Sequence, residues 1–334
     1  MLFKKFQTAL ASARIAAQDA YLVHMSGAVE TVDAKLAAEA ELQAYASALS
    51  TLLDDSSFGV NPHLTNKFAQ ILGEAHFWLM CLDRGLRLTR IPEVRGKKTP
   101  DFSATISSQS ICFEVKTLSV VGGDTGIANA LHSSLDAHID LEAQQRAGAR
   151  VAIATSEAQP YGDRVKRDQT LMSAINTLVE KTRGNIKADQ FARPNTFLVI
   201  NLSVIPPYVT EPKALRPAYL DDFMFPKAVT GDLWTLAFGK VGMLILGIPE
   251  FEGKPCVEGT FDKVGILEDE EFSAVAGLIF MIHPLERPSE LWGLFRGADI
   301  RKWEDGEPAL LEQILALTGK CWNDCGDTNG WQVQ

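Results

Sequence analysis

Positive charge is scarce in this chain of 334 residues. Acidic residues number 42 and basic residues 32, which gives a formal net charge of −10 at pH 7. Proteins that hold nucleic acid through charge alone are usually basic overall. The balance therefore argues against broad nonspecific binding to nucleic acid, although it leaves room for a local basic groove.

The sequence also lacks a long apolar run. Its most apolar internal stretch, residues 236–248, contains Lys240 and three glycines and is well short of the ~20 residues that a membrane span needs. Lys4 and Lys5 resemble the start of a secretory leader, but polar residues from Gln7 onward interrupt the apolar stretch that a leader requires. We therefore expect a soluble, cytoplasmic protein with no membrane segment.

Cysteine is sparse, and several common catalytic motifs are missing. The five cysteines are scattered and odd in number, which fits reduced thiols better than a disulfide framework. Cys321 and Cys325 are close in sequence, but no second pair accompanies them, and a zinc site needs four ligands. No phosphate-binding P-loop, Gly-x-Ser-x-Gly or His-Glu-x-x-His motif occurs. Hydrolysis through a serine or a zinc ion thus has little support from motifs.

Helix-breaking residues are rare near the N-terminus. No proline precedes Pro62, and no glycine lies between Gly27 and Gly59, so long helices are expected there. Beyond Pro62, the expected helices are 64–84, 127–146 and 165–190, and the expected extended segments are 86–92, 101–107, 110–118, 151–155 and 197–203. This alternation predicts an α/β fold with a mixed sheet.

Four regions follow from this organisation. They are a helical N-terminal region at 1–62, an α/β core at 63–205, a C-terminal part at 206–320 and a loose tail at 321–334 that would contain both late cysteines. Two apolar runs in the C-terminal part, 241–248 and 274–282, have the character of buried strands. They either extend the sheet of the core or form a second subdomain.

The stretch 99–118 carries the most informative chemistry. Ile111, Phe113 and Val115 alternate with Cys112, Glu114 and Lys116, so one face of this strand presents a carboxylate and an amine. A two-residue turn at Ser108 and Gln109 would pair Ser107 with Ser110 and bring Asp101 opposite Lys116, on the same face. A three-residue turn would reverse the face of Asp101 unless a bulge restored it.

Two carboxylates on the same face of one hairpin would suit a hard divalent ion. Asp101 and Glu114, helped by the backbone carbonyl of Val115, would offer oxygen ligands to Mg²⁺ or Mn²⁺. A metal there would activate water and offset charge on a phosphoryl group, while Lys116 oriented the water. The alternative is that Glu114 and Lys116 merely form the solvated face of an amphipathic strand.

These residues resemble the PD-(D/E)XK nuclease superfamily. Pro100-Asp101 is similar to its PD element and Glu114-Val115-Lys116 to its (D/E)XK element, over roughly residues 64–205. The resemblance implies a restriction-endonuclease-like mixed sheet flanked by helices, and catalysis by Asp101, Glu114 and Lys116. It also implies that Glu74, on the preceding helix, supports the metal.

One feature departs from the family pattern, because an additional helix and strand lie at about 120–160. If this pair is an insertion, the core helix and strand are those within 165–203, and Gln190 or Lys187 is the additional polar contributor. If the pair is instead part of the core, Gln144 takes that place. We favour the insertion.

Two basic clusters are candidates for contact with nucleic acid. Between Asp83 and Asp101 the chain has six basic residues and three acids, a local net charge of +3, and Arg95, Lys97 and Lys98 lie just before Asp101. Arg164, Lys166 and Arg167 begin another expected helix, where positive charge is unfavourable without a purpose such as phosphate contact. A solvated loop is the alternative for the first cluster.

We therefore expect a metal-dependent nuclease that hydrolyses phosphodiester bonds, with DNA a better candidate than RNA. The rival hypothesis is a catalytically silent nuclease-like module for binding or scaffolding, or a subunit active only with a partner, as in restriction or phage-defence systems. Aromatic residues such as Trp292, Phe295 and Trp303 indicate either core packing or a homo-oligomer surface.

Overall fold

The structure is a computed structural model. It describes residues 1–12, 20–36, 38–59, 61–92, 96, 98–118, 124–154, 170–202, 212–221, 227–247, 256–283 and 288–325. The chain divides into two compact units. Unit 1 comprises 1–80, 117–163 and 202–208, and unit 2 comprises 81–116, 164–201 and 209–334.

Unit 1 is helical in its described part, as the shortage of proline and glycine predicts. Its helices are α1 (Leu2–Ser12), α2 (Ala20–Lys35), α3 (Leu42–Leu53), most of α4 (Pro62–Asp83) and α5 (Asp124–Arg146). Phe6, Phe58 and Phe68 form an aromatic cluster, with Phe6 stacked on Phe68 at a centroid distance of 5.5 Å. Gly85 follows α4 with a φ of 78°, a conformation that glycine adopts without strain at a helix end.

The strand predicted at 151–155 is wrong for the residues that can be described. Residues 151–154 form no strand, and Val151 and Ile153 are each 73% exposed. The side-chain amide of Gln144 instead bonds both backbone groups of Ile153, accepting from its N–H at 3.0 Å and donating to its carbonyl at 2.9 Å. An apolar, β-branched run lacking a partner strand does not become a strand on propensity alone.

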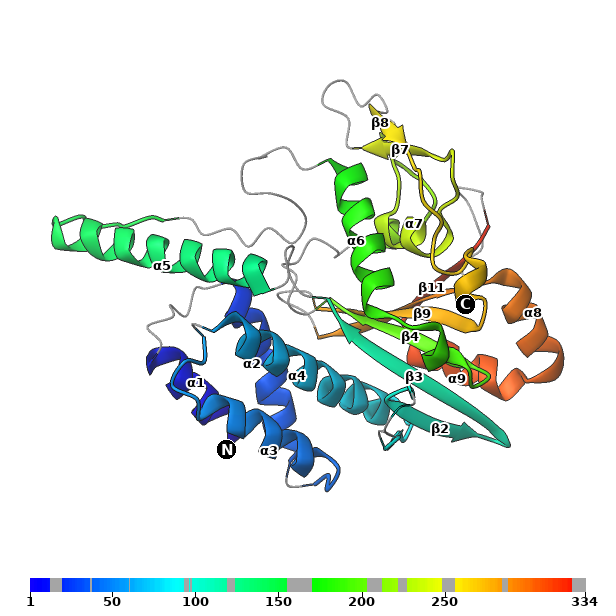
Figure 1. The fold of residues 1–334 in the computed structure, drawn as a ribbon, viewed down its shortest axis with the longest axis horizontal. Coiled ribbons are helices and arrows are strands. Elements are labelled where there is room, and N and C mark those ends of the chain that lie inside the picture. Colours follow the sequence, from blue (N-terminus) through cyan, green and yellow to red (C-terminus); the bar gives the residue numbers. More distant parts are fainter. Residues whose placement is uncertain are drawn as a thin grey trace. The chain divides into compact units, whose positions relative to one another are not determined.

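Unit 2 contains a seven-stranded mixed sheet in the order β1-β2-β3-β4-β9-β10-β11 (Figure 1). Its strands are β1 (Thr89–Arg90), β2 (Phe102–Ile106), β3 (Gln109–Thr117), β4 (Thr196–Asn201), β9 (Val275–Ile282), β10 (Glu290–Phe295) and β11 (Lys320–Asn323). Antiparallel pairs join β1 to β2, β2 to β3 and β9 to β10, whereas β4 with β9 and β10 with β11 are parallel. The predicted α/β class with a mixed sheet flanked by helices is confirmed.

The other elements of unit 2 are helices and two small hairpins. The helical elements are α6 (Leu171–Asn185), η1 (Ala188–Phe191), η2 (Pro212–Leu215), α7 (Asp232–Phe238), η3 (Glu270–Phe272), α8 (Gly297–Gly306) and α9 (Pro308–Leu317). The hairpins are β5 (Tyr219–Asp221) with β6 (Lys227–Val229), and β7 (Leu244–Gly247) with β8 (Cys256–Thr260). The helix expected at 165–190 is thus α6 in its described part, followed by the separate turn η1.

The two C-terminal apolar runs have different outcomes. The run at 274–282 becomes β9 and lies in the main sheet, whereas the run at 241–248 contributes β7 to a separate hairpin. The tail predicted at 321–334 begins too early, because Cys321, Trp322 and Asn323 are buried in β11. The indole N–H of Trp234 donates to the carbonyl of Asn323 at 2.8 Å, which holds β11 to α7.

Aromatic side chains form the centre of the core of unit 2. Phe197 of β4, Phe295 of β10 and Trp303 of α8 contact one another at centroid distances of 5.8 to 6.2 Å, and each is at most 1% exposed. Trp292 is fully buried, so core packing is the outcome for these aromatics. Among the helices of the described residues, none combines the length and apolarity needed to cross a membrane.

The β2–β3 hairpin has a different register from the predicted one. Ile106 pairs with Gln109, so the two-residue turn is Ser107-Ser108, one residue earlier than expected. Ser107 adopts the left-handed conformation, with a φ of 55°. The polar sequence Ser-Ser-Gln-Ser gives no strong turn signal such as Asn-Gly, which is why sequence patterning misplaced the turn. Asp101 consequently does not lie opposite Lys116.

Candidate functional site

Glu114 is a buried carboxylate in the middle of the sheet. It lies on β3, next to β4 (Figure 1), and is 1% exposed. Its Oε1 accepts hydrogen bonds from the Gln190 side-chain amide and from the Lys116 ammonium. Burial of a carboxylate costs free energy unless such donors surround it. The alternative of a solvated strand face is therefore wrong for Glu114.

Lys116 lies two residues beyond Glu114 on the same face of β3, because side chains alternate along a strand. Its side chain is 23% exposed, so Lys116 contacts both the buried carboxylate and solvent. An ammonium on such a side chain has three donors, which can serve Glu114 and also a water molecule or an anion arriving from solvent.

Gln190 is held in one orientation by the turn that carries it. The backbone N–H of Lys187 donates to its Oε1 at 2.8 Å, so the NH₂ end of the amide is the end directed at Glu114. Gln190 is 7% exposed. Of the two glutamines left open by the sequence, Gln190 contacts Glu114, whereas Gln144 bonds Asp140 and the backbone of Ile153. The contribution of Lys187 comes from its backbone, since its side chain is exposed.

Asp101 is tied to the same part of β3. Its backbone N–H donates to the carbonyl of Phe113 at 3.0 Å, and its Oδ2 accepts from the N–H of Val115 at 2.7 Å. Pro100 is buried and Asp101 half-buried. The carboxylate of Asp101 therefore lies against the backbone between Glu114 and Lys116, so the structure brings these three predicted residues together.

The chemical type of the donor atoms at this site suits a hard divalent ion. Asp101, Glu114 and the Val115 carbonyl all offer oxygen, and Mg²⁺ commonly binds through one or two carboxylates while keeping several waters. Within the described residues, no group of three or more His, Cys, Asp or Glu side chains forms a metal-binding cluster. Any ion at this site would thus depend on two carboxylates, with water and substrate completing its shell.

The remaining predicted residues have varied outcomes. Glu74 is half-buried on the part of α4 that belongs to unit 1, where its Oε2 accepts from the hydroxyl of Tyr45 at 3.3 Å. Its proposed support of a metal stays a prediction. Lys98 is exposed in unit 2. The other basic residues predicted to contact nucleic acid lie outside the described residues: Arg95, Lys97, Arg164, Lys166 and Arg167.

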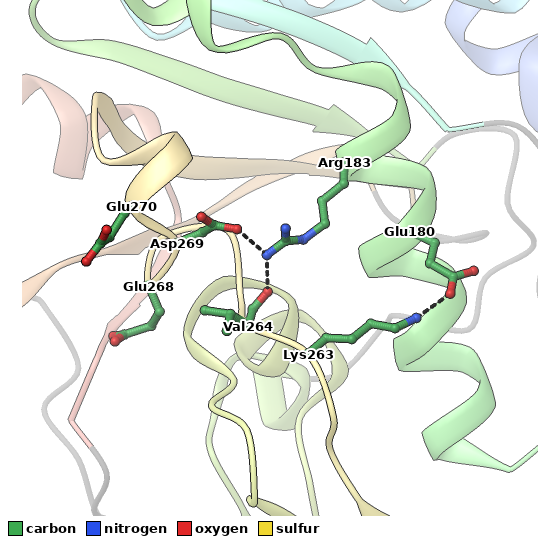
Figure 2. Close-up of a pocket in the computed structure, with 7 residues that line it drawn as sticks. All are labelled: Glu180, Arg183, Lys263, Val264, Glu268, Asp269 and Glu270. Carbon is green, nitrogen blue, oxygen red and sulfur yellow. Dashed lines mark hydrogen bonds and ion pairs between the residues drawn. The ribbon is translucent and has the colours of Figure 1, made fainter.

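A separate charged hollow lies between α6 and residues 263–270. The cavity has a volume of about 560 Å³, and Figure 2 shows the side chains that line it. The Arg183 guanidinium binds Asp269 at 2.5 Å and the carbonyl of Val264 at 2.6 Å, and Lys263 pairs with Glu180. These contacts connect α6 to the 263–270 segment, which gives the charges a structural role.

Cys321 is a structural thiol. Its Sγ lies 2.7 Å from the Thr318 hydroxyl, and burial raises the pKa of the thiol to about 11. A metal ligand must be a thiolate, and a raised pKa disfavours that form.

Sequence reasoning missed one polar constellation. His283 Nδ1 lies 2.9 Å from the Ser289 hydroxyl, and His283 Nε2 lies 3.2 Å from Oδ1 of Asn201. A search for clustered histidines does not find a single imidazole that lies between a hydroxyl and a side-chain amide. The available signal was positional, since Asn201 and His283 follow two apolar runs that become neighbouring parallel strands.

Comparison with known proteins does not assign the chain to a class: no family model, no curated protein and no solved structure matches it.

Proposed function

We propose that this protein is a metal-dependent nuclease of the PD-(D/E)XK kind, which hydrolyses phosphodiester bonds in DNA with Mg²⁺ or Mn²⁺ as cofactor. The observation that supports this most strongly is the buried carboxylate of Glu114, contacted by Lys116 and Gln190, with Asp101 anchored beside it. A strand that served only the fold would have no need of a 1%-exposed carboxylate, because an apolar side chain there is usually neutral or stabilising.

Each residue has a distinct role in this proposal. Asp101 and Glu114 would hold the divalent ion, with the carbonyl of Val115 as a further ligand. Lys116 would donate to the attacking water and to a phosphoryl oxygen, since its side chain is partly exposed beside Glu114. Gln190 keeps Glu114 in position through an amide whose other end is fixed by Lys187.

The metal, when bound, lowers the pKa of a water ligand and offsets charge on the phosphoryl group. The chain itself would supply the contacts that position the substrate. Lys98 is an exposed cation three residues before Asp101 and is available to contact the phosphate backbone, which positions a nucleic acid without reading its sequence.

The rival hypothesis is a silent module or a subunit that needs a partner. The net charge of −10 favours it, because the isolated chain would repel a polyanion. The two hypotheses differ in metal binding, since a scaffold has no use for an ion at Asp101 and Glu114.

The test is cleavage of plasmid, linear duplex, single-stranded DNA and RNA with Mg²⁺ or Mn²⁺. Wild type is compared with Glu114→Gln and Lys116→Ala, which we expect to lose at least about 100-fold in rate, as removal of a charge-stabilising or proton-transferring group does.

Lys263→Ala is the matched control. Lys263 is also paired with a glutamate, and its side chain is 25% exposed, against 23% for Lys116. The control should cleave like wild type. Activity that survives in both site variants would refute the assignment, and the absence of any thermal shift with Mn²⁺ in an inactive wild type would favour the scaffold.

A further inference from the structure

Three strands of unit 2 place polar side chains together at one end of the sheet. Asn201 is the last residue of β4 and pairs with Met281 of the parallel strand β9. His283 lies two residues beyond Met281 and therefore projects to the same side of the sheet as Asn201. Glu290 of β10 pairs with Ile282, so Ser289 comes opposite His283. The sheet topology itself brings Asn201, His283 and Ser289 together.

His283 lies between the other two residues and contacts each of them through a different ring nitrogen. The Ser289 hydroxyl lies 2.9 Å from Nδ1 of His283, within the 2.6–3.2 Å that a nucleophile and its base require. On the other side of the ring, Nε2 lies 3.2 Å from Oδ1 of Asn201. An oxygen at that point accepts the Nε2 proton, which leaves Nδ1 as the lone-pair nitrogen that faces the hydroxyl.

The three residues differ in how deeply they are buried. Asn201 is fully buried, whereas His283 and Ser289 are half-buried. A fixed inner residue, a base and an accessible hydroxyl are the parts of a serine or cysteine catalytic triad, in which asparagine can replace the acid. The group also lies at the carboxyl ends of parallel strands β4 and β9, where open α/β sheets commonly bind ligands.

We propose that Ser289, His283 and Asn201 form a second catalytic site, independent of Glu114, which hydrolyses carboxylic esters through an acyl-serine. Ser289 Oγ forms a bond to the ester carbonyl carbon while its proton passes to His283 Nδ1. The carbon–oxygen bond to the leaving alcohol breaks, and the proton passes from His283 to the leaving oxygen. Water then adds to the acyl group with His283 as base, releases the carboxylic acid and restores Ser289. Asn201 is a positioning residue that fixes the imidazole.

The test uses an alkyl fluorophosphonate probe on the full chain. Ser289 attacks phosphorus, fluoride leaves and the serine proton is released, so an activated serine gains a phosphonyl group that peptide mass spectrometry locates. We expect wild type to be labelled at Ser289 and Ser289→Ala to remain unlabelled there, with Ser103→Ala, a half-buried serine of β2, as the control that labels like wild type.

Two further variants separate catalysis from a merely structural role. His283→Gln should slow labelling by about 100-fold or more, the usual contribution of a general base. Asn201→Ala should slow it by about tenfold or more, and Asn201→Asp, which can only accept a hydrogen bond, should restore the rate. An unlabelled Ser289 in the wild type would overturn the proposal, as would full-rate labelling in a folded His283→Gln variant.

Discussion

At the scale of single residues, buried polar groups set the character of unit 2. Glu114 and Gln190 form a buried hydrogen bond, and Lys116 compensates the charge. Sequence alternation predicted that Glu114 and Lys116 share a face, because two residues apart on a strand always do. It could not predict the burial of Glu114, since that depends on what covers the strand. The contact of Glu114 with Gln190 rather than Gln144 agrees with the preference for an insertion at about 120–160.

Asp232 gives a prediction at the same scale. It is buried at the start of α7, where its Oδ1 accepts from the N–H of Leu233 at 2.9 Å. Burial raises its pKa to about 6 from an ordinary value of 3.8. Between those pH values the folded protein retains a proton that the unfolded chain releases, so the stabilising contribution is full below pH 3.8 and is lost as the pH rises to 6.

The variant Asp232→Asn removes this dependence while keeping an acceptor for Leu233. A shift of this size corresponds to roughly 3 kcal/mol. Urea unfolding should therefore show similar stability for the variant and wild type near pH 4, and a variant more stable by about that amount at pH 7. A difference that stays constant between these pH values would show that Asp232 titrates normally.

At the scale of elements, the sequence predicted which segments are helices and strands better than how they pair. Helices α4 and α5 and strands β2, β3, β4 and β9 lie close to the predicted ranges, and the region of α1 to α3 is helical as expected. The strand expected at 151–155 failed because it found no partner, and β9 could not be assigned to the main sheet because pairing between distant strands leaves no local signal. The hairpin turn was displaced by one residue for lack of a strong turn dipeptide.

The turn of the β2–β3 hairpin contains a serine in the left-handed conformation, and this can be tested by substitution. Ser107 has a φ of 55°, a conformation that costs non-glycine residues roughly 1–2 kcal/mol and β-branched residues the most. We expect Ser107→Val to be less stable than Ser107→Gly by about that amount in urea unfolding.

Ser108 is the matched control position for this comparison. Ser107 has a positive φ, whereas Ser108 does not. Valine at 108 should therefore be tolerated as well as glycine. A penalty at 108 and none at 107 would restore the turn predicted from the sequence and contradict the observed register.

At the scale of the whole molecule, the C-terminal half completes the sheet. The family resemblance covers roughly residues 64–205, yet β4 lies between β3 and β9, and β9 to β11 all come from beyond residue 274. All six residues of β4 are buried. The sequence left open whether residues 206–320 extend the sheet or form a second subdomain. The topology shows that β9 and β10 extend it, whereas β5 to β8 form two separate hairpins.

A fragment ending at residue 205 should consequently fail to fold its part of unit 2. It would leave β4 without its partner β9 and expose the apolar residues that β9 covers, and an unpaired apolar strand promotes aggregation. We expect amide hydrogen exchange to show no protection of β3 and β4 in residues 1–205, whereas both strands are protected in the full chain. Protection of these strands in the fragment would mean that β9 to β11 are dispensable for the core of unit 2.

The nuclease proposal is decided by the cleavage rate of wild type beside Glu114→Gln, with Lys263→Ala as the control, in Mn²⁺ and in Mg²⁺. We predict metal-dependent cutting of DNA by wild type and control, and a loss of about 100-fold or more in the Glu114 variant. Equal cutting by all three proteins would contradict the proposal, because the buried carboxylate would then have no part in the reaction.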